Sequence, residues 1–157
     1  MPDFEDDPLT GAERTFLRAL SNKKVRFLLV GMSAAVLQGA DVATQDLDLW
    51  FESLDAPEIG KAAALAGGFY ATRMQPPMVG GAGLERIDLV TQCSGLEPFD
   101  VEYRGAIAIP IGDLRLRVLP LERIIANKTA ADRPKDRAAL EQLRAALAVL
   151  REVERGR

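Results

Sequence analysis

Apolar and polar positions alternate along the 157-residue chain in patterns that predict a series of short helices and strands. Helices are expected where apolar residues recur every three to four positions, or where start and stop signals bound a short apolar run. These segments are 10–20, 33–38, 57–65, 120–131 and 135–154. Strands are expected in short apolar runs with β-branched or aromatic residues. These are 25–30, 46–51, 85–92, 101–108 and 114–119. The mixture predicts an α/β (α+β) domain that ends in a pair of helices.

Local signals sharpen some of these boundaries. Thr10 is followed three residues later by Glu13, which is the spacing of a capping box. Pro120 stands at the start of a predicted helix, where its missing N–H costs nothing. Residues 74–83 are rich in proline and glycine and are therefore expected to form a loop.

The length of the chain suits one domain with a hydrophobic core. We interpret residues 1–9 as an acidic N-terminal leader and residues 10–157 as a single domain. No apolar run reaches the about 18 residues of a membrane span, and the N-terminus lacks the apolar stretch of a secretory signal. Cys93 is the only cysteine and cannot form an internal disulfide. We therefore expect a cytoplasmic protein without a membrane partner.

The amino-acid composition excludes several kinds of active site. The chain has no histidine and one cysteine, which excludes Ser-His-Asp triads and most zinc sites. Any bound metal would have oxygen ligands, which favours Mg²⁺ or Mn²⁺. The 20 Lys and Arg are slightly outnumbered by 23 Asp and Glu, and they are scattered with some concentration after position 104. Tight non-specific binding to duplex nucleic acid is therefore not expected, which leaves room only for a local basic strip.

Two aspartates stand on the predicted strand 46–51. Because side chains alternate across a strand, Asp46 and Asp48 point to one face while Leu47 and Leu49 pack on the other. Two carboxylates about 6–7 Å apart at the Cα level repel each other, and a divalent cation between them would turn the repulsion into attraction. The alternative is a polar strand edge with two solvated aspartates.

A third aspartate lies within the apolar strand 85–92. Asp88 is costly to bury there unless it is paired or bound to a metal, and a salt bridge with Arg86 is one solution. Placed beside Asp46 and Asp48, it would instead complete a site for one or two Mg²⁺ ions. Such sites polarise a phosphoryl group and activate an attacking hydroxyl.

The glycine after the strand 25–30 supplies a second feature. Gly31 permits close approach of the backbone, and the free N–H groups of the helix that follows favour an anion such as phosphate. Ser33 has two interpretations, as a helix cap or as a contact to a phosphate oxygen.

Residues 27–51 resemble the signature of the DNA polymerase β-like nucleotidyltransferase superfamily: a strand, a glycine turn, a short helix, then Asp-x-Asp on the next strand. The likeness extends to the minimal nucleotidyltransferases, including the abortive-infection type of toxin–antitoxin loci. Asp88 in RIDLVT stands where those families carry a third acid, and residues 118–143 resemble another of their segments. The resemblance spans about residues 25–143 and implies a nucleotidyltransferase fold, with a mixed β-sheet and flanking helices.

This resemblance implies a metal-dependent enzyme that moves a nucleoside monophosphate from an NTP to a hydroxyl of a tRNA, a protein or a small molecule. Asp46 and Asp48 are expected to bind metal and triphosphate, and Asp88 to share the metal and help deprotonate the acceptor. The phosphates would be held by Gly31, Met32 and Ser33.

Three positions depart from the superfamily pattern and support a second hypothesis. Met32 replaces the usual Gly or Ser, while Gln38 and Val42 stand where related proteins often have His and Arg. The alternative is a catalytically weak member of a toxin–antitoxin pair that binds a cognate toxin or antitoxin protein.

The predicted C-terminal helices carry further polar candidates. Lys128 would lie at the border of the site, either as a contact to a nucleotide phosphate or on a solvated helix face. Asp136 is interpreted as a favourable charge in the first turn of the last helix. Glu102, Trp50 and Tyr103 are interpreted as structural.

Overall fold

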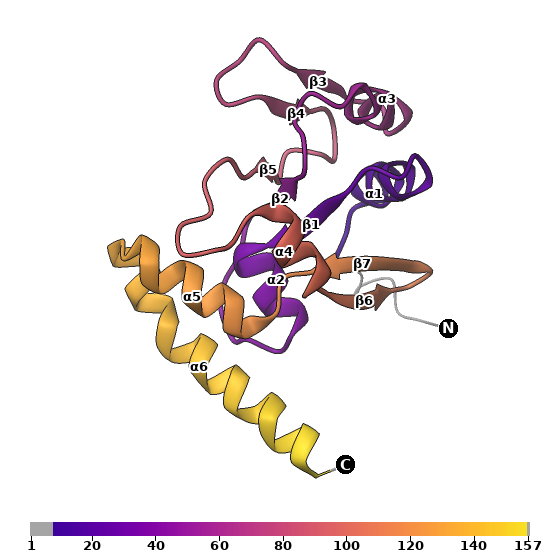
Figure 1. Ribbon diagram of the computed structural model, residues 1–157. Helices are drawn as coiled ribbons and strands as arrows, with labels where there is room; N and C mark the ends of the chain where they lie inside the picture. The colour runs from indigo at the N-terminus through magenta and orange to yellow at the C-terminus, as the bar shows by residue number, and fades with distance from the viewer. Residues whose placement is uncertain (1–7, 157) are drawn as a thin grey trace.

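The computed structural model describes residues 8–156, which fold around a five-stranded mixed sheet in the order β5-β2-β1-β7-β6 (Figure 1). Its strands are β1 (Phe27–Val30), β2 (Leu47–Phe51), β5 (Ile87–Leu89), β6 (Ile107–Ile111) and β7 (Leu114–Val118). A separate hairpin pairs β3 (Phe69–Ala71) with β4 (Met78–Gly80). The helices are α1 (Gly11–Asn22), α2 (Gly31–Leu37), α3 (Pro57–Leu65), α4 (Phe99–Arg104), α5 (Leu121–Ala131) and α6 (Pro134–Arg155). The predicted mixed sheet with flanking helices and a C-terminal helix pair is confirmed.

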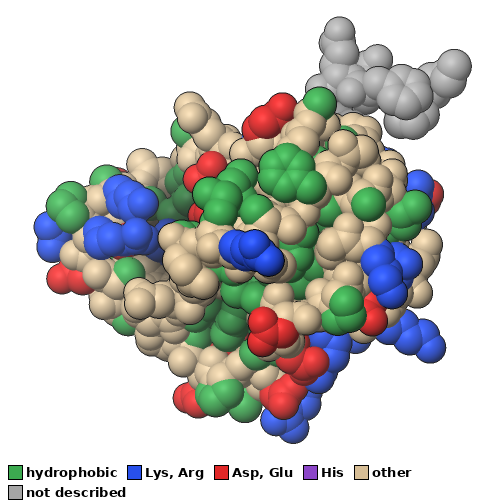
Figure 2. All heavy atoms as spheres, turned by 90° about the horizontal axis from the view of Figure 1, so that it is seen from above, with side chains coloured by type: hydrophobic (Ala, Val, Ile, Leu, Met, Phe, Trp, Pro, Cys, Tyr) green, Lys and Arg blue, Asp and Glu red, His purple; other side chains and the backbone are tan. Residues whose placement is uncertain are grey.

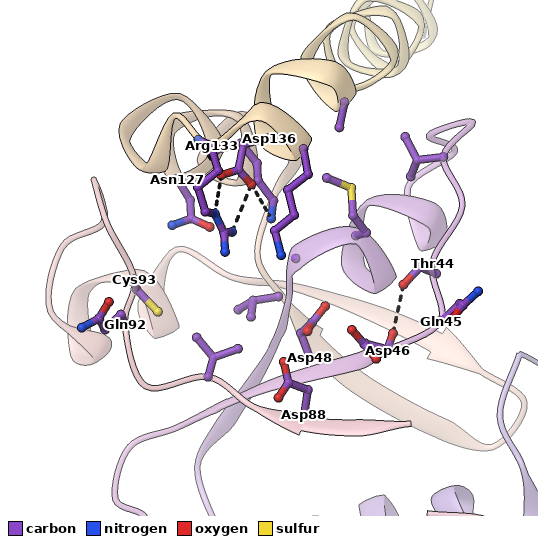
Figure 3. Close-up of a pocket in the computed structure, with 18 of the residues that line it drawn as sticks. Thr44, Gln45, Asp46, Asp48, Asp88, Gln92, Cys93, Asn127, Arg133 and Asp136 are labelled. Atoms are coloured by element: carbon purple, nitrogen blue, oxygen red, sulfur yellow. Dashed lines mark hydrogen bonds and ion pairs between the residues drawn. The ribbon is translucent and has the colours of Figure 1, made fainter. Parts of the chain in front are cut away.

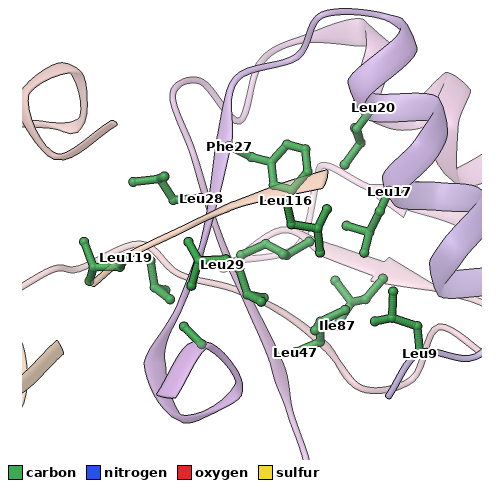
Figure 4. Close-up of a cluster of buried hydrophobic side chains, with 14 of the residues drawn as sticks. Leu9, Leu17, Leu20, Phe27, Leu28, Leu29, Leu47, Ile87, Leu116 and Leu119 are labelled. Atoms are coloured by element: carbon green, nitrogen blue, oxygen red, sulfur yellow. The ribbon is translucent and has the colours of Figure 1, made fainter. Parts of the chain in front are cut away.

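Strand β1 lies at the centre of the sheet and is buried at all four residues. It runs antiparallel to β2, with Val30 opposite Asp48, and parallel to β7, with Leu29 opposite Val118. Leu17 and Leu20 of α1 lie over the core beside this strand (Figure 4). Burial of each such side chain stabilises the fold by about 1.5–3 kcal/mol, so the end of β1 is a firm support for the residues that follow it.

Helix α1 begins with the predicted capping box. The Thr10 hydroxyl accepts a hydrogen bond from the Glu13 N–H, and the Glu13 carboxylate accepts one from the Thr10 N–H. Glu13 is fully buried and also accepts two hydrogen bonds from the Arg86 guanidinium, at 3.0 and 2.6 Å. Arg86 therefore pairs with Glu13, which leaves Asp88 without the salt bridge that the sequence had offered as an alternative.

We expect Glu13→Ala to lower the free energy of unfolding by about 3 kcal/mol, because it removes the buried partner of an ion pair together with a helix cap. Asp113→Ala is the control, since the Asp113 carboxylate also pairs with arginine, with Arg14 and Arg18 of α1, but its side chain is 71% exposed. Its loss should cost less than about 1 kcal/mol. Urea denaturation of both variants measures the difference. Equal losses would mean that the Glu13 contacts are no stronger than surface ones.

Several sequence expectations need correction. Residues 101–108 were expected to be a strand, but they contain most of α4 and only the start of β6. The loop expected at residues 74–83 contains β4, and the strand expected at 85–92 is ordered as β5 over three residues only. Within the predicted leader, residues 1–7 lie outside the described part of the chain, whereas Leu9 is 8% exposed and belongs to the core.

The strand prediction for 101–108 failed because the contacts that favour a helix are distant in sequence. Pro98 is the N-cap of α4, and Glu102 turns inward, where it accepts hydrogen bonds from Arg123 of α5 at 3.0 and 2.7 Å. It also accepts one from the Glu97 N–H. These contacts are consistent with the interpretation of Glu102 as a structural residue, although the strand predicted for it was wrong.

The surface carries both signs of charge. In the view from above in Figure 2, acidic and basic side chains are interspersed among apolar ones, and no broad basic area covers this face. Among residues 8–156, no helix is both long and apolar enough to cross a membrane.

Candidate metal and nucleotide site

A cavity of about 820 Å³ opens at the end of β1, between the sheet and the turn that joins α5 to α6 (Figure 3). Its floor is formed by Val30 and Gly31 together with Asp46, Asp48 and Asp88. One wall is the loop 41–45 before β2, another is the loop that follows β5, and the α5–α6 turn faces them across the space. A cavity of this size falls in the range of small-molecule and cofactor sites, which is about 300–1,000 Å³.

The structure brings the three predicted aspartates together. Asp48 and Asp88 are register partners in the parallel pair β2–β5, and Asp46 precedes β2 on the same side. Each offers a carboxylate oxygen, and these atoms lie within 4.8 Å of one another. Opposite oxygens around one Mg²⁺ are about 4 Å apart, so small rotations would let all three carboxylates share an ion. The all-oxygen donor set fits Mg²⁺ or Mn²⁺.

The Asp48 carboxyl has a raised pKa. Partial burial, followed by repulsion from Asp88 and Asp46, raises the pKa of its carboxyl to about 6, while Lys128 opposes the rise. A carboxyl that is held in an unfavourable ionised state by its neighbours has the most to gain from a bound cation. The pKa shift and the geometry therefore point to the same place in the cavity.

Gly31 is required where α2 meets this cluster. Its φ is +65°, in the left-handed region, and a Cβ at this position would lie 2.5 Å from Oδ2 of Asp48. A side chain here would be strained and would also displace the carboxylate. Gly31 and Met32 both line the cavity, and their contact with phosphate remains a prediction.

The position of Ser33 agrees neither with a helix cap nor with a contact to phosphate. The N-cap of α2 is Val30, and Ser33 is not part of the cavity lining. Its buried hydroxyl donates a hydrogen bond to the Val30 carbonyl at 3.1 Å and accepts one from the Asp48 N–H at 3.2 Å. Ser33 therefore connects α2 to β2 and holds the backbone of Asp48, which corrects the expectation that it faces the phosphates.

The α5–α6 turn forms a basic wall opposite the aspartates. Lys128 Nζ lies 3.2 Å from Oδ1 of Asp136, and Arg133 donates to both oxygens of that carboxylate. The Asp136 side chain is only 1% exposed. Burial alone would raise its pKa, but the hydrogen bonds from Arg133 and Lys128 outweigh this and lower the pKa to about 2. Asp136 thus does more than favour a helix terminus: it holds two cations at the cavity wall.

We expect Asp136→Asn to destabilise the protein by about 2–3 kcal/mol at neutral pH, because it leaves Lys128 without a buried partner. The pKa of Asp136 is depressed in the folded state, so its contribution is present above about pH 4 and is lost as the pH falls toward 2. The stability difference between wild type and variant, measured by denaturation across pH 2–7, should therefore shrink in acid. A difference that is constant over this range would contradict the ion pair.

Two polar residues that the sequence did not assign to this site also shape it. The Gln38 amide is buried, donates to the carbonyls of Ala34 and Leu119 and accepts from the Leu121 N–H, which ties α2 to the start of α5. Asn127 donates to the Ser94 carbonyl at 2.8 Å and holds the loop after β5 against α5. The sequence gives no local signal for the contacts that join these segments, because the partners lie more than 30 residues apart.

No protein-family model and no curated protein matches the chain. Among solved structures, it is similar to the solution structure of the antibiotic-resistance factor ANT(2'')-Ia, a nucleotidyltransferase. The likeness covers 88% of this chain and 82% of that chain, with a TM-score of 0.53 and 16% sequence identity. The chain therefore has a nucleotidyltransferase-like fold.

Proposed function

We propose that the protein is a metal-dependent nucleotidyltransferase that moves a nucleoside monophosphate from an NTP to a hydroxyl acceptor. The observation that carries this proposal is the convergence of three carboxylates at one end of a cavity whose other wall bears Lys128. Carboxylates bind the metal that accompanies a triphosphate, and an ammonium group across the cavity matches the charge of the phosphates themselves. The nucleotidyltransferase-like fold supports the same chemistry.

In the proposed reaction, an acceptor oxygen attacks the α-phosphorus of the NTP. A new oxygen–phosphorus bond forms, the bond to the β-phosphate bridging oxygen breaks, and pyrophosphate leaves with the electron pair. Asp88, which is exposed toward the cavity, accepts the acceptor proton, and Asp46 and Asp48 would hold the divalent ion together with Asp88. Lys128 contacts the triphosphate, and the N–H groups of Gly31 and Met32 face its terminal phosphates. A bound Mg²⁺ or Mn²⁺ would neutralise charge on the phosphoryl oxygens.

The test uses NTPs labelled at either the α- or the γ-phosphate, incubated with the protein, Mg²⁺ and a cell extract. Transfer of a nucleoside monophosphate retains the α label and never the γ label on an acceptor, whose size fraction identifies tRNA, protein or small molecule. Asp48→Ala should abolish the signal, whereas Asp41→Ala, which removes an acid of the same cavity outside the cluster, should keep it. Absence of α label from every fraction with all four NTPs would overturn the enzyme proposal.

A second candidate function is that of a catalytically weak partner in a toxin–antitoxin pair. Its support is the absence of basic side chains at two positions where related proteins often carry them. Val42 lines the cavity wall, and the Gln38 amide is bonded to the backbone of Leu119, just after β7, and of Leu121 at the start of α5. Co-purification of a specific partner protein, together with a failed transfer assay, would favour this role over catalysis. Either role is compatible with the cytoplasmic location expected from the sequence.

A further inference from the structure

A second hollow of about 440 Å³ lies away from the aspartates and gathers cations. It is lined by Ser21, Lys24, Val25, Arg26, Phe27, Tyr103, Arg115 and Arg117, and among the described residues no acidic side chain lines it. We refer to these residues as the basic hollow. Phe27 begins β1 here, while Val30 lines the aspartate cavity at the end of the same strand, so the two sites are about 10 Å apart along the strand at 3.3 Å per residue.

The strand pattern explains why two arginines meet on one face. In β7, Leu114, Leu116 and Val118 are buried, whereas Arg115 and Arg117 are exposed on the opposite face. They stand about 6.6 Å apart at the usual rise of a strand. Their partners across the β6–β7 ribbon are Pro110 and Ala108, which carry no charge. The ribbon therefore presents two guanidinium groups over a neutral, exposed surface.

Three of the four cations have no acidic partner within the described part of the chain. Arg26 is paired with Glu52 and Asp100, but Lys24, Arg115 and Arg117 form no ion pair within residues 8–156. Like charges gathered without a counter-charge repel one another, and they are most stable when an anion binds among them. The whole chain has a net charge of −3, so this local excess of positive charge is unusual for it and favours the binding of an anionic ligand.

Tyr103 determines which part of an anionic ligand can be recognised. The guanidinium groups of Arg26 and Arg117 both lie 4.4 Å from the centre of its ring. Phe99 stacks on the same ring at 5.3 Å. The ring is therefore already in contact with its neighbours and offers no free platform for a nucleobase. A nucleic acid in the basic hollow would therefore be bound by the cations, which contact phosphate regardless of base sequence.

We propose that the basic hollow binds the phosphodiester backbone of single-stranded RNA and that this RNA is the acceptor of the transfer reaction. The second part rests on the proposed function, whereas the binding itself needs neither metal nor NTP. Helix α4 and the loop before it connect the two sites, because Leu96 lines the aspartate cavity and Tyr103 lines the basic hollow. A short stretch of one RNA strand covers the separation of about 10 Å between the two sites.

The test measures binding of a fluorescent single-stranded oligoribonucleotide to the full chain in EDTA, without NTP, across 50–200 mM salt. Three phosphate contacts predict a slope of log K against log salt of about −2, which is an approximately 20-fold loss of affinity over this range. Oligo-U and oligo-A should bind equally within about threefold, because no base is read. A polyglutamate peptide of equal charge should bind far more weakly, and preferential binding of that peptide would overturn the proposal in favour of an acidic protein partner.

Matched variants locate the contact. Lys24→Gln/Arg115→Gln/Arg117→Gln should weaken RNA binding at 50 mM salt at least about tenfold and flatten its salt dependence. Lys61→Gln/Arg144→Gln/Arg151→Gln removes the same charge from other exposed positions and should leave binding nearly unchanged. Thermal denaturation of both variants confirms that they are folded. Equal binding by wild type and the basic-hollow variant would overturn the inference.

The RNA-binding test and the test of the proposed function can succeed or fail independently of each other. Asp48→Asn should bind RNA as wild type does, since binding does not use the carboxylates. If RNA binds through the basic hollow but never receives α label, the binding surface stands and RNA is excluded as the acceptor. If transfer occurs to some acceptor while the basic-hollow variant binds RNA normally, the enzyme stands and this inference fails.

Discussion

Asp48→Asn is expected to stabilise the metal-free protein and, at the same time, to eliminate its response to metal and nucleotide. Partial burial and the charges of Asp88 and Asp46 raise the pKa of Asp48 to about 6, which means that its ionised form is unfavourable in the fold. Removing that charge should increase the free energy of unfolding at pH 7–8 by about 1–2 kcal/mol after allowance for solvent screening. For a chain of this length, this corresponds to an increase in Tm of a few degrees.

The stabilisation by metal and nucleotide should be lost in the same variant. Mg²⁺ with an NTP at a hundredfold excess over Kd should stabilise the wild type by about 2.7 kcal/mol, and the variant should show no shift. Loss of a metal-binding carboxylate should also reduce transfer at least about 1,000-fold, equivalent to about 4 kcal/mol of barrier. Thermal denaturation with and without ligands measures the first effect, and the α-label assay the second.

The pH dependence follows from the same shift, with a definite sign. Because the pKa of Asp48 is higher in the folded state than in the unfolded state, the folded protein binds this proton more tightly, and the associated stability is present below about pH 4. It is lost as the pH rises through about 6. The metal-free wild type should therefore lose this contribution between pH 4 and 6, while Asp48→Asn should not.

Asp41→Asn is the matched control, since Asp41 lines the same cavity but lies outside the carboxylate cluster. It should leave both the metal-free stability and the ligand shift close to those of wild type. A wild-type protein that shows no shift with Mg²⁺ or Mn²⁺ and any NTP would remove the basis for a metal site, and the partner-protein role would replace the enzyme.

Gly31→Ala is expected to be the most damaging change of a single methyl group at this site. The left-handed φ of +65° costs an alanine about 1–2 kcal/mol. The added Cβ would lie 2.5 Å from Asp48 Oδ2, so either α2 or the carboxylate must move. We expect a total loss of stability of about 2–4 kcal/mol and the disappearance of metal-induced stabilisation.

Gly39→Ala separates the two causes. Gly39 also has a left-handed φ, of +95°, but no described residue lies within 4 Å of a Cβ built there. It should suffer only the backbone strain and should keep the metal response. Chemical denaturation and a Mg²⁺ titration of the two variants make the comparison. If Gly31→Ala binds metal as well as Gly39→Ala does, the contact between Gly31 and Asp48 has no role in shaping the site.

Local sequence information was sufficient for elements whose signals lie within a few residues. The capping box of Thr10 and Glu13, the apolar run of β1 and the helix of residues 57–65 are all observed where they were predicted. The alternation of side chains in a strand was also enough to place Asp46 and Asp48 on one side of β2. These features depend on backbone geometry and near neighbours, which a short segment carries by itself.

Tertiary structure decided what depends on distant partners. Asp88 lies beside Asp48 because β5 pairs in parallel with β2, and it does not pair with Arg86 because Glu13 of α1 binds that arginine. The helix α4 replaced a predicted strand because Arg123 supplies the partner of the buried Glu102, 21 residues away. A buried charge pairs with the opposite charge that tertiary packing places beside it. The local pattern of apolar and polar residues does not specify which residue that partner is.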